Sequence, residues 1–280
     1  MTLPDNFSLS EFVQRVLAED LGTGDVTSDA IIAKDARFTA EMNARQALVV
    51  AGIEIAAAFF RALDEDVQVE QLIKDGTRVE RGTTLMRLGG NARSMLAAER
   101  SALNTLQHLS GIATLTRQYV DAIDGTGTVL LDTRKTIPGL RVLEKFASRM
   151  GGAQNHRMRL DDGVLIKDNH VAVCGSVAEA VRRAKAAATG LEVQVEVDRI
   201  DQIEPALAAG ADRLLLDNMD PAQLREAVQL VSHRVPLEAS GGVTLETIRF
   251  LAETGVTFIS VGRVTQSAPA VDIGLDYSLG

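Results

Sequence analysis

Residues 192–262 decide the fold of this chain, and they read EVQVEVDRIDQIEPALAAGADRLLLDNMDPAQLREAVQLVSHRVPLEASGGVTLETIRFLAETGVTFISVG. The stretch contains four short apolar runs about 20 residues apart, EVQVEVD, RLLLDNM, PLEASGG and FISVG, separated by amphipathic segments. Buried parallel strands give continuous Val, Ile and Leu runs because helices cover both faces of their sheet. The stretch therefore predicts successive strand–helix units.

Two earlier runs extend this pattern, TVLLDTRK at 128–135 and GVLIKDNH at 163–170, and bring the predicted strands to six. Six is fewer than the eight strands of a complete α/β barrel. The pattern leaves two α/β architectures open: an incomplete parallel barrel of six or seven strands, or an open doubly wound sheet. Both place a functional site at the carboxyl ends of the strands. Pro205 is expected to kink or restart its helix.

The N-terminal third has a different pattern. Ser8 and Glu11 have capping-box spacing, which predicts a helix start, and short alternating runs follow between residues 36 and 88, with turn signals at Asp75-Gly76 and Gly89-Gly90. Residues 94–123 keep helical periodicity, and Gly111 is expected to divide them into two helices. We therefore predict an α+β domain over 1–110 and a catalytic α/β domain over 111–280, with 267–280 as a tail that can return to the first domain.

Composition narrows the class of protein. The chain is 46% hydrophobic and 24% charged, which is typical of a globular protein with a sizeable core. Cys174 is the single cysteine, so an intramolecular disulfide and a cysteine-cluster metal site are both excluded, as expected for a reducing compartment. The chain begins without a signal pattern and lacks an apolar run of membrane-spanning length. We expect a cytoplasmic protein.

The charge is distributed unevenly. The net charge of −9 argues against a general binder of nucleic acid or anionic membranes. Residues 132–170, however, carry eight basic and five acidic side chains, a local +3, and also hold two histidines. Charge effects are screened beyond about 8 Å at physiological salt, so this segment can bind an anion despite the overall sign. A small polyanionic ligand fits better than a nucleic acid.

The residues that follow the predicted strands divide by chemistry. The cationic group can bind carboxylate or phosphate oxygens and comprises Arg134, Lys135, His156, Arg157 and Lys167. The acidic pair, Glu196 and Asp217, suits a Mg²⁺ that takes its other ligands from water and substrate. The glycine-rich group can present backbone N–H groups to a phosphate and comprises Ser240, Gly241, Gly242 and Gly262.

Read together, these segments resemble the quinolinate phosphoribosyltransferase family. The resemblance extends from LAEDLGTGDVTSDAI to the C-terminus and depends most on TRKTIPGLRVLEK and on NHRMRLDDGVLIKDNH. It implies an N-terminal α/β sandwich joined to an incomplete α/β barrel, assembled as a homodimer or hexamer. It also implies that quinolinate and phosphoribosyl pyrophosphate react with Mg²⁺ to give nicotinate mononucleotide, pyrophosphate and CO₂ in de novo NAD biosynthesis.

The resemblance also implies residue roles. The quinolinate-binding residues would be Thr133, Arg134, Lys135, His156, Arg157 and Lys167, with Arg100 supplied by the neighbouring subunit. The phosphoribosyl pyrophosphate site would comprise Glu196, Asp217, Ser240, Gly241, Gly242, Gly262 and Arg263. Glu196 and Asp217 would also hold the metal, and the catalytic residues would be Lys135, Lys167, Glu196 and Asp217.

This sequence departs from the family pattern at three positions. Arg263 and Gln266 stand where the family usually has a small residue and a histidine, which leaves the phosphate contacts of this segment open, and Arg159 replaces an expected glycine. His108 and His233 lie in predicted helices without evident partners, so we interpret them as surface or packing residues.

Three alternatives remain. A Schiff-base aldolase on a similar barrel would use Lys167 or Lys135. A molybdenum-associated homologue would share the fold, although the intact TRK and HR elements argue against it. The segment VEQLIKDGTRVERGTTLMRLGG resembles part of a biotin or lipoyl carrier, but the chain has no lysine turn that could be modified.

Overall fold

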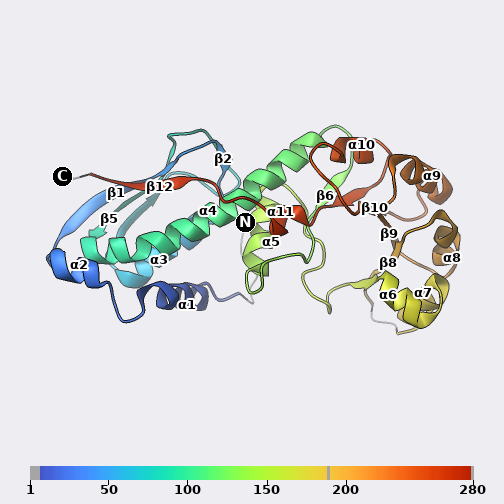
Figure 1. Cartoon of the computed structure of the whole chain (residues 1–280), viewed down its shortest axis with the longest axis horizontal. Helices are drawn as coiled ribbons and strands as arrows, with labels where there is room; N and C mark the ends of the chain where they lie inside the picture. The colour runs from blue at the N-terminus through green and yellow to red at the C-terminus, as the bar shows by residue number, and fades with distance from the viewer. Residues whose placement is uncertain (1–6, 188–189, 279–280) are drawn as a thin grey trace. The chain divides into compact units, whose positions relative to one another are not determined.

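The computed structural model describes residues 7–187 and 190–278, which form two compact units (Figure 1). Unit 1 draws on residues 1–117, 142–152 and 267–280, and unit 2 on residues 118–141 and 153–266. The division is therefore more interleaved than a single cut at residue 110, because an internal helix and the C-terminal tail both belong with the N-terminal part. In the described part of the chain, no helix has the length and apolarity needed to cross a membrane.

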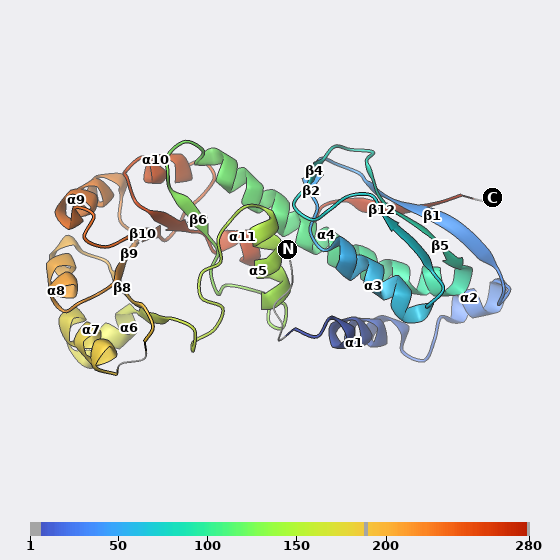
Figure 2. The same ribbon diagram turned by 180° about the vertical axis from the view of Figure 1, so that it is seen from behind.

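Unit 1 is built on a four-stranded antiparallel sheet with the order β12-β1-β5-β3. Along β1, Ala40, Met42 and Ala44 are buried, whereas Thr39 and Glu41 point to the opposite, more open face. In both views α3 and α4 lie along one face of the sheet (Figure 1, Figure 2). The strands of unit 1 are β1 (Arg37–Ala44), β2 (Leu48–Val49), β3 (Gln68–Gln71), β4 (Arg78–Val79), β5 (Thr84–Asn91) and β12 (Ile273–Ser278).

The helices of unit 1 include α1, which begins where the sequence predicts: the Ser8 hydroxyl accepts a hydrogen bond from the Glu11 N–H at 3.2 Å. The Gly89-Gly90 turn prediction is wrong, because both residues lie inside β5, where Gly89 pairs with Gln68 and with Thr39. The helices are α1 (Leu9–Leu21), α2 (Val26–Ile31), α3 (Ile53–Leu63) and most of α4 (Ala92–Ala122) and α5 (Arg141–Met150).

Unit 2 contains the six predicted strands in one parallel sheet with the order β6-β11-β10-β9-β8-β7. From β7 to β11, strands that follow one another in the chain are also neighbours in the sheet, and β11 then pairs with β6. This order has no reversal point, so the doubly wound alternative is wrong and the sheet is a barrel that lacks the β6–β7 pairing. The strands are β6 (Val129–Leu131), β7 (Val164–Ile166), β8 (Val193–Val197), β9 (Arg213–Asp217), β10 (Leu237–Ser240) and β11 (Phe258–Ser260).

Except for α11, which follows β11, the helices of unit 2 connect these strands and lie outside the sheet (Figure 2). Pro205 lies in the first turn of α8, directly after the short 3₁₀ helix η1, so the predicted restart of this helix is confirmed. The helices are α6 (Asp168–Cys174), α7 (Val177–Ala186), η1 (Ile200–Gln202), α8 (Ile203–Ala208), α9 (Pro221–Val231), α10 (Ile248–Ala252) and α11 (Arg263–Gln266).

Gly111 does not divide the long helix. Helix α4 is continuous from Ala92 to Ala122, and a Cβ at Gly111 would overlap the carbonyl oxygen of Pro269. The glycine therefore lets Pro269 and Ala270 lie close to the helix, and it does not break the helix.

Substituting Gly111 with alanine is expected to lower the free energy of unfolding by about 1–3 kcal/mol, because the methyl group must displace backbone rather than a flexible side chain. Thermal denaturation of Gly111→Ala against wild type measures this loss. Gly125→Ala is the matched substitution at a position where a Cβ meets nothing within 4 Å, although its positive φ of 78° adds its own strain. Equal stability of wild type and Gly111→Ala would contradict the close approach.

Candidate active site

The cationic segment after β6 lies against the loop after β11. The Thr133 hydroxyl accepts a hydrogen bond from the Lys135 N–H at 3.0 Å, and the Thr265 hydroxyl donates to the Lys135 carbonyl at 2.7 Å. A Cβ at Gly262 would lie only 2.7 Å from Cδ of Lys135, so this glycine leaves room for the lysine side chain. The structure therefore brings together Thr133, Lys135 and Gly262, as the strand-end argument predicts.

A buried carboxylate fixes the segment that precedes β7 against the end of β6. Asp132 is fully buried; its Oδ1 accepts from the His156 N–H at 2.9 Å and its Oδ2 from the Asn155 side-chain amide at 2.5 Å. Main-chain bonds link the same segments, from the Gln154 N–H to the Leu130 carbonyl and from the Asp132 N–H to the Gln154 carbonyl. Sequence reasoning did not single out Asp132 in this positioning role.

His156 and Arg157 follow directly in this segment. His156 Nδ1 accepts a hydrogen bond from the Arg157 N–H at 2.7 Å, and its Nε2 lies 3.1 Å from Oε1 of Gln194. The Arg157 guanidinium donates through Nη1 to the Gly163 carbonyl at 2.8 Å. The cations that follow β6 and those in the loop before β7 therefore lie in the same region of unit 2.

The guanidinium groups of Arg134 and Arg157 repel each other in this region. Burial, together with the positive charge of Arg134, lowers the pKa of Arg157, and the Asp162 carboxylate opposes the shift only in part. Within the described residues, no hydrogen-bond partner reaches the buried Nε of Arg134. Like charges held together, with a buried donor unsatisfied, favour a bound anion.

The acidic pair lies at the ends of β8 and β9, beside Lys167. Lys167 Nζ is 2.9 Å from Oε2 of Glu196. Burial and then the negative charge of Glu196 raise the pKa of Asp217, against the charge of Lys167, a hydrogen bond from Asn218 and the charge of Lys135. The two carboxylates and two lysines predicted from separate strand ends therefore interact in the structure.

Glu196 and Asp217 are the residues that would have to hold the Mg²⁺ that the sequence resemblance implies. Across 7–187 and 190–278, no group of three or more His, Cys, Asp or Glu side chains could hold a metal ion on its own. Two carboxylates, one with a raised pKa caused by burial and by the other, match a Mg²⁺ that keeps water and substrate oxygens as its remaining ligands. The residues fit such an ion.

The glycine pair after β10 packs against the loop after β9. The Asn218 N–H donates to the Ser240 carbonyl at 2.9 Å, and a Cβ at Gly241 would overlap the Asn218 side-chain amide. Gly241 and Gly242 have φ values of 99° and 61°, which favour glycine. Ser240, Gly241 and Gly242 are thus held beside Asp217 by backbone geometry.

The three departures from the family pattern have different surroundings. Gln266 is exposed at the end of α11. Arg263 opens α11, and its charge acts on the pKa of Tyr119, which burial chiefly raises, and on that of Glu246, which a Thr244 hydroxyl chiefly lowers. Arg159 is exposed and forms an ion pair with Asp161 at 3.0 Å. It therefore belongs to the loop surface.

Arg100 and His108 lie on α4, within unit 1. Arg100 is exposed. The interpretation of His108 as a residue without a partner is wrong, because its Nε2 lies 2.9 Å from Oε1 of the fully buried Glu144 on α5. The partner is 36 residues away in the sequence, so helical periodicity could not reveal it.

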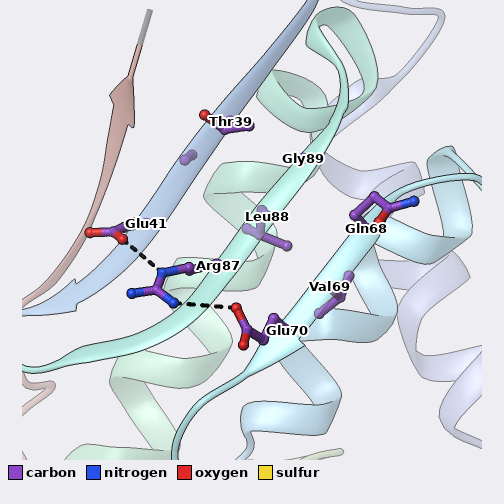
Figure 3. A pocket seen from close by; sticks show the side chains of 9 residues that line it. Thr39, Glu41, Gln68, Val69, Glu70, Arg87, Leu88 and Gly89 are labelled. Atoms are coloured by element: carbon purple, nitrogen blue, oxygen red, sulfur yellow. Dashed lines mark hydrogen bonds and ion pairs between the residues drawn. The ribbon is translucent and has the colours of Figure 1, made fainter. Parts of the chain in front are cut away.

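A hollow on the open face of the unit 1 sheet holds none of the predicted site residues (Figure 3). Arg87 of β5 lies at its centre and pairs with Glu41 of β1 at 3.0 Å and with Glu70 of β3 at 3.4 Å. Its central cation is thus neutralised within the sheet.

Known proteins are similar to this chain over nearly its whole length. Two family models match the chain, quinolinate phosphoribosyl transferase, N-terminal domain, over residues 25–110 and the C-terminal domain of the same family over residues 112–276. A nicotinate-nucleotide pyrophosphorylase (carboxylating) of Mycobacterium leprae is 44% identical over 273 residues, which covers 94% of this chain and 95% of the relative. A probable nicotinate-nucleotide pyrophosphorylase (carboxylating) of Bacillus subtilis is 42% identical over 276 residues, 98% of this chain and 95% of the relative.

Solved structures give the same result. The nicotinate-nucleotide pyrophosphorylase of Francisella tularensis superposes with a TM-score of 0.93 at 40% identity, covering 96% of each chain. The likeness thus includes both units of the chain.

Proposed function

The chain belongs to the quinolinate phosphoribosyltransferase family, and from that premise we propose that it transfers the phosphoribosyl group of phosphoribosyl pyrophosphate to quinolinate. The products are nicotinate mononucleotide, pyrophosphate and CO₂, a step of de novo NAD biosynthesis. The enzyme is a pentosyltransferase.

One observation carries this proposal most directly: Arg134 and Arg157 act on each other as like charges, and the buried Nε of Arg134 has no hydrogen-bond partner in the part of the chain that the structure describes. Quinolinate carries two adjacent carboxylates on its pyridine ring. A carboxylate accepts two parallel N–H bonds from a guanidinium, so the dianion neutralises both arginines. Thr133, Lys135, His156 and Lys167 are proposed to complete the quinolinate site. Two fixed carboxylates would orient the ring nitrogen toward the ribose C1.

We propose that Glu196 and Asp217 bind phosphoribosyl pyrophosphate. They would hold Mg²⁺ and the ribose hydroxyls, and the ion, when bound, neutralises charge on the departing pyrophosphate. The carboxylates also stabilise the positive charge that develops on the ribose as the C1–O bond breaks. Ser240, Gly241, Gly242 and Gly262 are proposed to bind the 5′-phosphate, with Arg263 beside them.

The bond changes need no covalent enzyme intermediate. The ring nitrogen lone pair forms the new bond to C1 while pyrophosphate leaves with the C1–O electron pair. The nitrogen is then quaternary and accepts the electron pair freed when the adjacent carboxylate departs as CO₂, and a proton from the medium takes its place on the ring carbon. Lys135 and Lys167 are proposed to hold the charges of both substrates during these steps.

We further propose that a second copy of the chain completes the quinolinate site with Arg100, in a homodimer or hexamer. The exposure of Arg100 on α4 leaves its guanidinium accessible to another subunit. The single cysteine fits a reducing compartment, so we place the reaction in the cytoplasm.

The aldolase alternative is less favoured by the same geometry. The Lys167 amine lies 2.9 Å from a Glu196 carboxylate oxygen, so it is engaged in an ion pair, whereas a Schiff-base lysine must be free to attack a carbonyl. Borohydride trapping with a carbonyl substrate is expected to give no adduct. The molybdenum-associated alternative is less favoured as well, because the matching family models and relatives are those of quinolinate phosphoribosyl transferase and nicotinate-nucleotide pyrophosphorylase (carboxylating).

Direct assay tests the proposal. Incubation with quinolinate, phosphoribosyl pyrophosphate and Mg²⁺ is expected to give nicotinate mononucleotide and equimolar CO₂. EDTA should abolish turnover and added Mg²⁺ should restore it, because the two carboxylates alone cannot neutralise a pyrophosphate leaving group. Failure to form the mononucleotide under any Mg²⁺ concentration would refute the assignment.

A further inference from the structure

The tetrapeptide IPGL at 137–140 turns the chain back on itself after the cationic residues that follow β6. The Leu140 N–H donates to the Ile137 carbonyl at 3.0 Å, and Gly139 has a φ of 84°. A proline at the second position and a glycine with positive φ at the third are the features of a type II turn. The turn brings Arg141 back beside the cationic residues, although it stands several positions after them in the chain.

Arg141 is the first residue of α5, at the end of the helix where a basic side chain is least favourable. The N-terminus of a helix carries a partial positive charge, so the helix dipole disfavours a cation in the first turn. Helix formation therefore does not account for an arginine at this position.

The Arg141 guanidinium donates hydrogen bonds from all three of its nitrogens. Nε donates to the Thr136 hydroxyl at 3.1 Å and Nη2 to the Arg134 carbonyl at 3.5 Å, so two of the contacts hold the segment after β6. Nη1 donates to the Met158 carbonyl at 3.3 Å, in the loop before β7. One side chain thus joins the two segments that supply Arg134 and Arg157.

The contacts are made beside both of these arginines. One acceptor is the carbonyl of Arg134 itself, and the other carbonyl belongs to Met158, which directly follows Arg157. The Met158 N–H is held in turn by the Asp162 carboxylate, which accepts it at 2.7 Å. Because Met158 is bonded through both its N–H and its carbonyl, Arg141 fixes this loop relative to Arg134.

The substrate makes this separation important. Quinolinate presents two carboxylates at a fixed distance on a rigid ring, so two arginines can bind both carboxylates only if their main chains lie at a matching distance. A misplacement of about 1 Å, even one caused by a residue away from the reacting atoms, can cost about 10²-fold in rate.

We propose that Arg141 is a positioning residue that holds the main chains of Arg134 and Arg157 at the separation that lets both guanidinium groups bind quinolinate together. The inference rests on the proposed function, because it takes those two arginines as quinolinate-binding residues. It adds a cation that acts on the substrate through other residues, by way of their main chain.

Steady-state kinetics of Arg141→Lys test this inference. The variant keeps the positive charge, but an ammonium on a flexible stem does not reproduce the rigid fork of donors that reaches both segments. We expect the KM for quinolinate to rise by about tenfold or more. The KM for phosphoribosyl pyrophosphate should change by less than about twofold because, among the residues that the structure describes, the hydrogen bonds of Arg141 do not reach Glu196 or Asp217.

The matched control is Arg199→Lys. Arg199 is an exposed arginine of unit 2 that pairs with Asp201 at 3.0 Å, so its variant should behave as wild type. A wild-type KM for quinolinate in Arg141→Lys would show that only the charge of Arg141 matters, and equal rises in both KM values would show a general disturbance of the site. Either result overturns the inference while wild-type turnover, and with it the proposed function, stands. Absence of turnover in the wild type would instead refute the proposed function.

A second variant guards against misfolding. Thr136→Val is nearly isosteric and removes the hydroxyl that accepts from Arg141 Nε, and we expect it to raise the KM for quinolinate by about two- to fivefold. If Arg141→Lys fails to fold in thermal denaturation, a wild-type KM for quinolinate in Thr136→Val overturns the inference.

The double variant separates a shared contact from two independent effects. Because both substitutions break the same hydrogen bond, the rise in the KM for quinolinate in Arg141→Lys/Thr136→Val should be close to that of Arg141→Lys alone. A rise equal to the product of the two single effects would contradict the inference.

Discussion

Replacing Arg134 with alanine is expected to lower kcat/KM for quinolinate by about 10²–10³-fold. The loss is large because a partly buried guanidinium that meets a carboxylate is worth about 2–5 kcal/mol when one partner is truncated, and each 1.36 kcal/mol corresponds to about tenfold. Among residues 7–187 and 190–278, no group bonds to the buried Nε of Arg134, so none of them replaces this contact. Initial rates at varied quinolinate concentration measure the effect.

Arg159→Ala is the matched control for Arg134→Ala. Arg159 is exposed in the same cationic segment and pairs only weakly with the solvent-exposed Asp161, so its loss should leave kcat/KM near the wild-type value. Arg134→Lys should recover only part of the activity, because an ammonium cannot make two parallel bonds to a carboxylate. If Arg134→Ala kept the wild-type kcat/KM, the quinolinate site would have to be placed elsewhere.

Replacing Glu196 with glutamine is expected to lower kcat/KM for phosphoribosyl pyrophosphate by about 10²–10³-fold, since an amide supplies neither the charge for Mg²⁺ nor that for the developing positive ribose. The substitution also removes the ion pair of Lys167 and the like charge that contributes to the raised pKa of Asp217. The Mg²⁺ concentration that gives half-maximal rate should therefore rise as well. Rates at varied substrate and varied Mg²⁺ separate the two effects.

Asp198→Asn is the control for Glu196→Gln. Asp198 follows the same strand, is exposed and interacts with Arg199 at 3.5 Å, so its substitution should leave the Mg²⁺ dependence unchanged. A Glu196→Gln variant with wild-type Mg²⁺ dependence would show that this carboxylate does not hold the ion.

The sequence predicts the strands of unit 2 better than their arrangement. All six apolar runs form strands because buried parallel strands must be continuously apolar, as Leu214, Leu215 and Leu216 illustrate. The choice between barrel and open sheet depends on which strands pair at long range, and single-sequence periodicity carries no such information. The same limit explains Gly111, whose reason lies in contact with Pro269 rather than in its own helix.

The site shows a similar division. Residues at the carboxyl ends of the strands, such as Lys167 and Glu196, could be predicted to meet because parallel strands end at one edge, and they interact at 2.9 Å. Gln194 and Glu238 lie inside β8 and β10, so the sequence pattern counts them as part of apolar runs. A signal for them existed, because polar residues within a buried run need partners. The partners themselves, on β9 and in the loop at 153–157, could be found only in the structure.

The pairing of β1 with β12 has a consequence for how the chain is made. Its register joins Ala44 to Ile273 and Ala40 to Tyr277, so the sheet that contains β1 cannot be completed until residues 273–278 have been synthesised. Unit 2 lies wholly before that point in the chain and can fold while synthesis continues. A premature stop before residue 267 would thus leave the barrel strands intact, yet deprive the first unit of an edge strand and uncover Gly111 on α4.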